Sequence, residues 1–304
     1  MTNPGSVAPN AATRPLDAVA AAIVVALCLS WGFNQVAIKV AIHDVPPLIQ
    51  AAARSGLAAL IVTGWAWLRR IPLFARDGTL IPGVVAGVGF AIEFILIYRG
   101  MLYTTATRAV LFIYLAPFFV VIGARFVLPV DRFSLWQWSG LALSFAGMLV
   151  AFGAPTPALD PRQALGDVMM IGGAAFWAMT TLIIKASALN KVSSEKVMLY
   201  QLVVSAPLMA LAAYADGERV TGVPHILSWL SLGYQTLYVV PITFVIWFAL
   251  IVRYSASRLS AFTFLTPLFG VAAGALVLGE PLTPGFAAAV VLVAAGLIVV
   301  NRAR

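Results

Sequence analysis

Long apolar stretches dominate the chain, separated by short segments that contain charged residues, proline or glycine. Ten stretches can be delimited, at residues 18–42, 47–68, 79–99, 104–126, 134–153, 165–187, 195–215, 227–251, 257–279 and 284–301. Each is close to the ~20 residues that a helix needs to cross a bilayer. Strands of a membrane β-barrel would alternate apolar and polar residues over about 10 positions. The pattern therefore predicts an all-α integral membrane protein of about ten transmembrane helices.

The composition supports this prediction. Of 304 residues, 62% are hydrophobic and only 10% are charged, and the mean hydropathy is +0.98. A soluble domain has about 25% charged residues, so a soluble globular protein is excluded. The single cysteine, Cys28, has no partner for an internal disulfide, and no cluster of Cys and His has the spacing of a structural zinc site. We expect neither a metal nor a cofactor.

The basic residues indicate the orientation in the membrane. The net charge is +8, but the Lys and Arg residues are scattered singly or in pairs rather than gathered into the basic stripe that nucleic acids require. Thirteen of the 19 fall in connections on the same side as the N-terminus. The positive-inside rule therefore predicts that both termini are cytoplasmic, with residues 1–17 as a cytoplasmic tail. The first apolar run exceeds the 7 to 15 residues of a signal-peptide core, and we expect a retained helix.

The second half of the chain repeats the first. Trp31 through Lys39 aligns with Trp177 through Lys185, and the segment from Arg108 through Pro117 aligns with that from Arg258 through Pro267. The repeats are assigned to residues 18–153 and 154–304, with five helices each. Because five is odd, the second repeat enters the membrane from the opposite side, so the halves are inverted. Inverted repeats are typical of secondary transporters, which bind substrate near the membrane midplane between the halves.

Short motifs in both halves resemble those of a known family. They are SWGFN at 30–34, AIK at 37–39, LAP at 115–117, LTPL at 265–268 and GEPL at 279–282. In their order and duplication they resemble EamA-type members of the drug/metabolite transporter superfamily. The first half departs from the pattern where LPVD at 128–131 replaces the Gly-Glu pair. The resemblance implies ten helices in a bacterial inner membrane and export of small metabolites, often amino acids. The nearest kind is an aromatic amino-acid exporter.

Depth along the helices selects candidate site residues. Trp31 and Trp177 lie more than ten residues into their helices, from opposite faces of the membrane, and Asn34 lies a turn beyond Trp31. At the midplane these groups either line a substrate cavity or pack and hydrogen-bond between helices. The same two alternatives hold for a set of residues predicted in the outer halves of other helices: Tyr98, Tyr103, Phe112, Gln235 and Tyr238.

Glu93 is the one acidic residue deep within a predicted span, about six residues from the outer end of its helix. Ionisable groups inside a membrane are functional candidates by default. Arg54 lies about seven residues from the outer end of its own helix, so both sit roughly 9 to 10 Å deep on the helix rise. We predict that the two residues form an ion pair, either structural or responsive to substrate, and that Glu93 contributes to substrate binding.

Four prolines interrupt predicted spans, and one of them is Pro207 in the seventh. Pro117 and Pro267 fall near the middles of the fourth and ninth spans, and Pro241 interrupts the eighth. Proline removes an intrahelical hydrogen bond and kinks the helix. Each is either a hinge for gating or a static bend, and the repeat favours Pro117 and Pro267 as the functional pair.

These features predict a secondary carrier and not an enzyme. The chain contains no nucleotide-binding loop and no Ser/His/Asp arrangement with a catalytic domain. We expect export of neutral or aromatic amino acids, or similar small metabolites, by alternating access. The alternative is an organic-cation efflux carrier that uses Glu93 as the counter-charge. The expected partners are the small-molecule substrate and the lipid bilayer, with no nucleic acid and no obligate protein partner. Direction and proton coupling stay open.

Overall fold

The computed structural model describes residues 16–128, 133–155, 160–279, 281–282 and 284–302. Most of the predicted N-terminal tail, residues 1–15, lies outside the described residues, as does part of the segment at 128–131. The described part of the chain is helical and contains no β-strand, so the predicted all-α class is confirmed. Its helices are α1 (Ala18–Ala41), α2 (Pro47–Leu68), α3 (Leu80–Met101), α4 (Ala106–Ile113), α5 (Ala116–Val127), α6 (Leu135–Phe152), α7 (Pro161–Ala186), η1 (Ala188–Lys191), α8 (Ser194–Ala215), α9 (Ile226–Gly233), η2 (Tyr234–Phe244), α10 (Val245–Arg253), α11 (Ala256–Phe262), α12 (Leu265–Leu278) and α13 (Phe286–Arg302).

The ten predicted stretches correspond to these elements in order. Nine spans in the described residues are long and apolar enough to cross a membrane, and α13, with 17 residues, is a shorter apolar helix. The fourth span consists of α4 and α5, the eighth of α9, η2 and α10, and the ninth of α11 and α12. The chain is therefore a multi-pass membrane protein.

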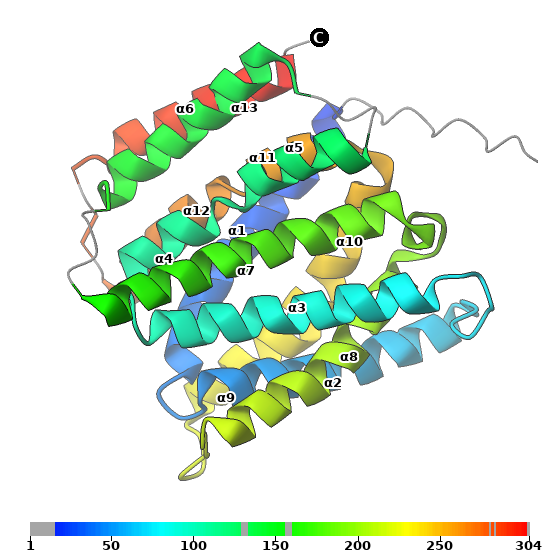
Figure 1. The fold of residues 1–304 in the computed structure, drawn as a ribbon. Helices are drawn as coiled ribbons and strands as arrows, with labels where there is room; N and C mark the ends of the chain where they lie inside the picture. The colour runs from blue at the N-terminus through cyan, green and yellow to red at the C-terminus, as the bar shows by residue number, and fades with distance from the viewer. Residues whose placement is uncertain (1–15, 129–132, 156–159, 280, 283, 303–304) are drawn as a thin grey trace, which may run out of the picture.

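Two helix pairs relate the halves directly. The second helices of the two repeats, α2 and α8, pack together, and so do the fifth helices, α6 and α13. They lie on opposite sides of the bundle, with the other helices between them (Figure 1). In the α6 and α13 pair a Cβ atom at Gly296 would lie 2.5 Å from the carbonyl oxygen of Gly140. Only glycine permits this approach, which is the usual way for membrane helices to pack closely.

The remaining helices repeat the same cross-pairing. In the first repeat α1 packs against α12, and in the second its counterpart α7 packs against α4 and α5. Local structure repeats as well: the hydroxyls of Thr105 and Ser255 cap α4 and α11 by accepting from the backbone N–H of Arg108 and Arg258. Such caps satisfy amide groups that have no partner within the helix. The intertwined halves make one inverted-repeat bundle.

The predicted proline bends occur as helix breaks. The fourth span breaks between α4 and α5, and Pro117 lies in the first turn of α5. The ninth breaks between α11 and α12, with Pro267 in the first turn of α12. Proline is tolerated there because the missing N–H would have no helical partner. Pro241 lies within η2, an 11-residue π-helix that the sequence did not predict. The gating role of these prolines stays a prediction.

Candidate functional site

The two ends of the bundle differ in how they enclose the interior. We call the end where α1 begins the near end and the opposite end the far end. Cys28, Gln35 and Lys39 share one stripe of α1. Cys28 is fully buried, whereas Gln35 and Lys39, closer to the far end, are exposed. This stripe of α1 is therefore enclosed toward the near end and open toward the far end.

The repeat-equivalent stripe of α7 is enclosed. Thr181 and Lys185 correspond to Gln35 and Lys39, yet they are buried, with 4% and 6% of their surface exposed. The Lys185 ammonium donates hydrogen bonds to three backbone carbonyls at the end of α10, at 2.6 Å (Ile251), 2.8 Å (Val252) and 2.8 Å (Tyr254). A cation there satisfies carbonyls that have no helical partner and complements the helix dipole. Lys185 thus ties α7 to α10 at the near end.

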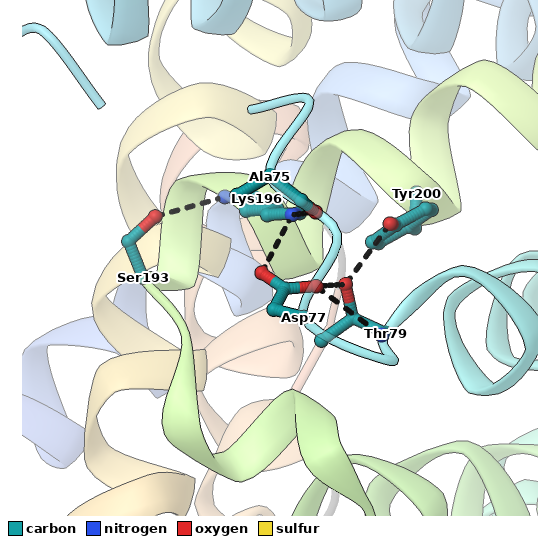
Figure 2. A network of polar contacts seen from close by, with 6 residues as sticks. All are labelled: Ala75, Asp77, Thr79, Ser193, Lys196 and Tyr200. Carbon is teal, nitrogen blue, oxygen red and sulfur yellow. Dashed lines mark hydrogen bonds and ion pairs between the residues drawn. The ribbon is translucent and has the colours of Figure 1, made fainter. Parts of the chain in front are cut away.

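A second contact at the near end joins the two repeats (Figure 2). The Lys196 ammonium, in the first turn of α8, donates to the Asp77 carboxylate at 2.8 Å and to the Ala75 carbonyl at 3.2 Å. Asp77 also accepts from the Thr79 hydroxyl at 2.5 Å, and Thr79 bonds the Tyr200 hydroxyl at 3.0 Å. The hydrogen bond from Lys196, and then that from Thr79, lowers the pKa of Asp77 to about 2. The α2–α3 connection is thereby fastened to α8.

The far end has a corresponding pair of contacts. The Glu218 carboxylate, after α8, accepts from the backbone N–H groups of Leu48 (3.3 Å) and Ile49 (3.0 Å) in the first turn of α2. Asp44, before α2, accepts from the Ser228 hydroxyl at 2.6 Å and from the His225 backbone at 2.8 Å. These bonds, Ser228 foremost, lower the pKa of Asp44 to about 2. The α2 and α8 pair is fastened at both ends.

A row of buried polar residues follows one face of α2, and we call it the polar cluster. Gln235 of η2 contacts Gln50, Arg54 lies one turn further along α2, and Glu93 precedes the Phe94 that Arg54 contacts on α3. Gln235 donates to Gln50 over a long 3.5 Å, and Gln50 donates to the Val45 carbonyl at 2.7 Å. The Gln235 side chain is fully buried, and its Oε1 has no hydrogen-bond partner among the described residues. The cluster therefore retains an enclosed acceptor that nothing in the described chain satisfies.

Arg54 and Glu93 are both buried, with 3% and 7% of their surface exposed. The guanidinium carbon of Arg54 lies 4.6 Å from the centre of the Phe94 ring, and its enclosed Nε finds no acceptor in the part of the chain that the structure describes. Glu93 precedes Phe94 in α3, but no ion pair within 4.0 Å joins Glu93 to Arg54 among those residues. The predicted ion pair is thus not a direct contact in this conformation, because Arg54 lies over Phe94.

The two predicted tryptophans lie in different surroundings. The indole N–H of Trp31 donates to the Thr243 hydroxyl at 2.9 Å, and its ring packs against Phe244 and Trp247 at centroid distances of 5.7 and 5.3 Å. Trp177 instead lies edge-on to Tyr114, 6.1 Å away, beside the break between α4 and α5. Sequence reasoning missed Thr243, Phe244 and Trp247.

A signal for those residues was present in the repeat. The spacing that separates Arg108 from Arg258 also separates Glu93 from Thr243 and Phe94 from Phe244. Extending the alignment backward from Arg108 would have added Thr243 and Phe244 to the candidates Gln235 and Tyr238 in the eighth span. The acid of the first repeat thus corresponds to a hydroxyl in the second.

The remaining predicted residues are scattered. Tyr98 is buried in an apolar cluster with Leu48 and Met209. The Tyr238 hydroxyl bonds Ser30 at 2.9 Å where η2 meets α1, so this contact joins two helices. Tyr103 is 42% exposed, and the Phe112 ring centre lies 5.4 Å from the guanidinium carbon of Arg108. Asn34 is 8% exposed, and its enclosed Oδ1 lacks a partner among the described residues. Their contact with substrate stays a prediction.

Comparisons with known proteins agree with this architecture. Residues 18–153 and 164–302 match the model of the EamA-like transporter family. A "Probable amino-acid metabolite efflux pump" of Salmonella typhimurium strain LT2 is 31% identical over 281 residues, which cover 88% of this chain and 90% of that protein. A protein of the same name from Escherichia coli K12 is 27% identical over 293 residues, 93% and 94% of the two chains. A solved crystal structure superposes with a TM-score of 0.80 at 18% identity, covering 93% of this chain and 96% of the other.

Proposed function

Because the chain belongs to the EamA-like transporter family, we propose that it is a secondary carrier that exports neutral and aromatic amino acids or similar small metabolites from the cytoplasm by alternating access. Membership makes it a membrane transporter and not an enzyme. The amino-acid substrate is supported by the printed names of the Salmonella and Escherichia relatives. The inner membrane, with both termini cytoplasmic, is supported by the distribution of basic residues.

The single observation that carries alternating access is the difference between the repeat-equivalent stripes of α1 and α7. Gln35 and Lys39 are exposed at the far end, whereas Thr181 and Lys185 are buried at the near end. In an inverted repeat, exchanging the conformations of the two halves closes the end that was open and opens the end that was closed. With cytoplasmic termini, the near end faces the cytoplasm and this conformation is open to the outside.

The exchanged conformation has a defined contact to form. Lys185 binds the carbonyls that end α10, and the corresponding carbonyls at the end of α3 belong to Met101, Leu102 and Thr104. Lys39 is the repeat equivalent of Lys185. In the inward-facing state Lys39 binds the end of α3, which closes the far end, while Lys185 releases α10.

Thiol labelling tests the conformational part of this proposal. Gln35→Cys and Thr181→Cys are made in a Cys28→Ala background and exposed to a membrane-impermeant maleimide from the outside of intact cells. We expect rapid labelling at position 35 and little at position 181. Equal labelling at both positions, or faster labelling at position 181, would contradict the outward-facing assignment.

Flux measurements test the identity of the substrate. Purified protein in proteoliposomes is given a panel of labelled amino acids, with and without an imposed proton gradient. Transport limited to neutral and aromatic amino acids supports the proposal, and gradient-independent flux identifies a uniporter. Transport of organic cations alone would favour the cation-efflux alternative, which the charge of Arg54 near Glu93 disfavours.

A further inference from the structure

Two opposite charges are buried together near the far end without touching each other. The guanidinium of Arg54 on α2 lies against Phe94, the residue after Glu93 on α3, and within the described residues neither Arg54 nor Glu93 has a side-chain hydrogen bond or an ion pair. We propose that these residues form the head-group site of a zwitterionic amino acid, in which Arg54 binds the carboxylate and Glu93 binds the ammonium. The inference rests on the proposed function and assigns its specificity to two residues.

Arg54 has the properties of a carboxylate-binding group that lacks its ligand. A buried charge without a partner is costly, and several kcal/mol of desolvation are normally offset by a paired ion and hydrogen bonds. Phe94 holds the guanidinium from one side through a cation–π contact at 4.6 Å. The planar guanidinium presents paired N–H donors that match the two oxygens of a carboxylate. A ligand carboxylate therefore supplies the acceptors that Arg54 lacks.

Glu93 supplies the opposite charge on the neighbouring helix. Its side chain is 7% exposed and accepts no hydrogen bond from the described chain. An ammonium has three N–H donors. The enclosed Oε1 of Gln235, which has no partner among the described residues, belongs to the same cluster through the contact of Gln235 with Gln50. A bound ammonium thus satisfies groups that helix packing leaves unpaired.

The repeat indicates that these charges are not needed to build the fold. Arg54 lies at the position in α2 that Gln201 occupies in α8, and Glu93 corresponds to Thr243. Both counterparts are buried and uncharged, in helices with equivalent packing. One charged pair in one repeat provides a single zwitterion site rather than two. A purely cationic substrate would meet the positive charge of Arg54.

Three ligands that share a phenyl ring distinguish the role of Arg54 from that of Glu93. L-Phenylalanine carries both groups, 2-phenylethylamine lacks the carboxylate, and 3-phenylpropionate lacks the ammonium. Each is titrated as an inhibitor of labelled L-phenylalanine exchange in proteoliposomes, with wild type, Arg54→Gln and Glu93→Gln. Two variants serve as controls: Arg302→Gln, at an exposed charge, and Glu195→Gln, at a half-buried acid in the first turn of α8. Thermal unfolding of every variant checks that it is folded.

We expect a crossed pattern. Arg54→Gln weakens L-phenylalanine and 3-phenylpropionate by about 10- to 100-fold, the range for one charge-assisted hydrogen-bonded pair, and does not weaken 2-phenylethylamine, whose repulsion by Arg54 it removes. Glu93→Gln weakens L-phenylalanine and 2-phenylethylamine to a similar extent and does not weaken 3-phenylpropionate. Should the neutral variants fail to fold, Arg54→Lys and Glu93→Asp keep the charge and are expected to keep the preference for zwitterions with weaker binding.

Other outcomes overturn the inference. Equal weakening of all three ligands by both neutral variants would identify a structural role, and unchanged binding would place the head group elsewhere. Charge-conserving variants that lose the preference for zwitterions would also refute it. If the wild type transports amino acids but the variants do not show the crossed pattern, this inference alone is refuted. Wild type that transports none of the amino-acid panel refutes the proposed function and the head-group site together.

Discussion

Replacing Lys185 by methionine removes the contact that closes the near end while keeping an unbranched side chain of similar length. The contact consists of three hydrogen bonds from one ammonium, at 2.6, 2.8 and 2.8 Å. Bonds to a charged group are worth about 1.5–3 kcal/mol each before the ammonium's own desolvation is counted. A cation at a partly buried helix C-terminus is worth up to about 2 kcal/mol net, and we take about 2 kcal/mol for this contact.

The contact exists only while the near end is closed, so its loss acts on the balance of the two states rather than on both equally. A change of about 2 kcal/mol shifts that balance about 30-fold toward the inward-facing state. In the labelling assay, Lys185→Met is expected to slow modification of Gln35→Cys from the outside and to speed modification of Thr181→Cys from the cytoplasmic side. Lys39→Met is expected to do the opposite, because it removes the corresponding contact from the other state.

Lys191→Met is the matched control, because Lys191 lies at the same end but is exposed. It should leave both labelling rates unchanged. Labelling of the Lys185→Met protein at wild-type rates would refute the reasoning, since a contact of that size cannot be lost from one state alone without moving the equilibrium. A parallel loss of labelling at both positions would indicate misfolding, and thermal unfolding separates the two cases.

Three further predictions concern stability and transport. Asp77→Asn leaves the buried ammonium of Lys196 without its charge partner and is expected to lower the unfolding temperature; the folded pKa of about 2 lies below the ordinary value of 3.8, so the difference from wild type should be present above pH 3.8 and vanish toward pH 2 in unfolding scans. Gly296→Ala forces a Cβ to 2.3 Å from a neighbouring hydroxyl and should destabilise by about 1–3 kcal/mol, whereas Gly233→Ala, with open space around it, should not. Trp31→Phe loses its 2.9 Å hydrogen bond and should slow amino-acid flux several-fold without a comparable loss of unfolding temperature.

Hydrophobic periodicity and repetition were enough to predict the helices. The bilayer requires each span to satisfy its own backbone, so a run such as 47–68 can be little else than a helix, and the observed α2 has those bounds. Pro117 and Pro267 also marked the broken spans correctly, because a missing N–H acts locally.

The site was less predictable because its geometry depends on side-chain directions across helices. Equal depth suggested that Arg54 and Glu93 would meet, but depth fixes only one of three coordinates, and the Phe94 ring takes the guanidinium instead. Tyr98 was selected by the same rule and turned out to pack in an apolar cluster. The π-helix η2 has no hydrophobic period that distinguishes it from an α-helix over 11 residues.

The lysine contact at the end of α10 also bears on energetics. Duplication supplied the same side chain at both ends, Lys39 and Lys185, and in the proposed exchange each lysine closes its end by binding backbone carbonyls at a helix terminus. The free energy that one lysine contributes when its end is closed is matched by the other lysine when the opposite end is closed. The free-energy difference between the two conformers therefore nearly cancels. In a carrier built this way, the lysine contacts store no free energy in either conformer. The solute's own concentration difference across the membrane is then free to set the direction of net flow.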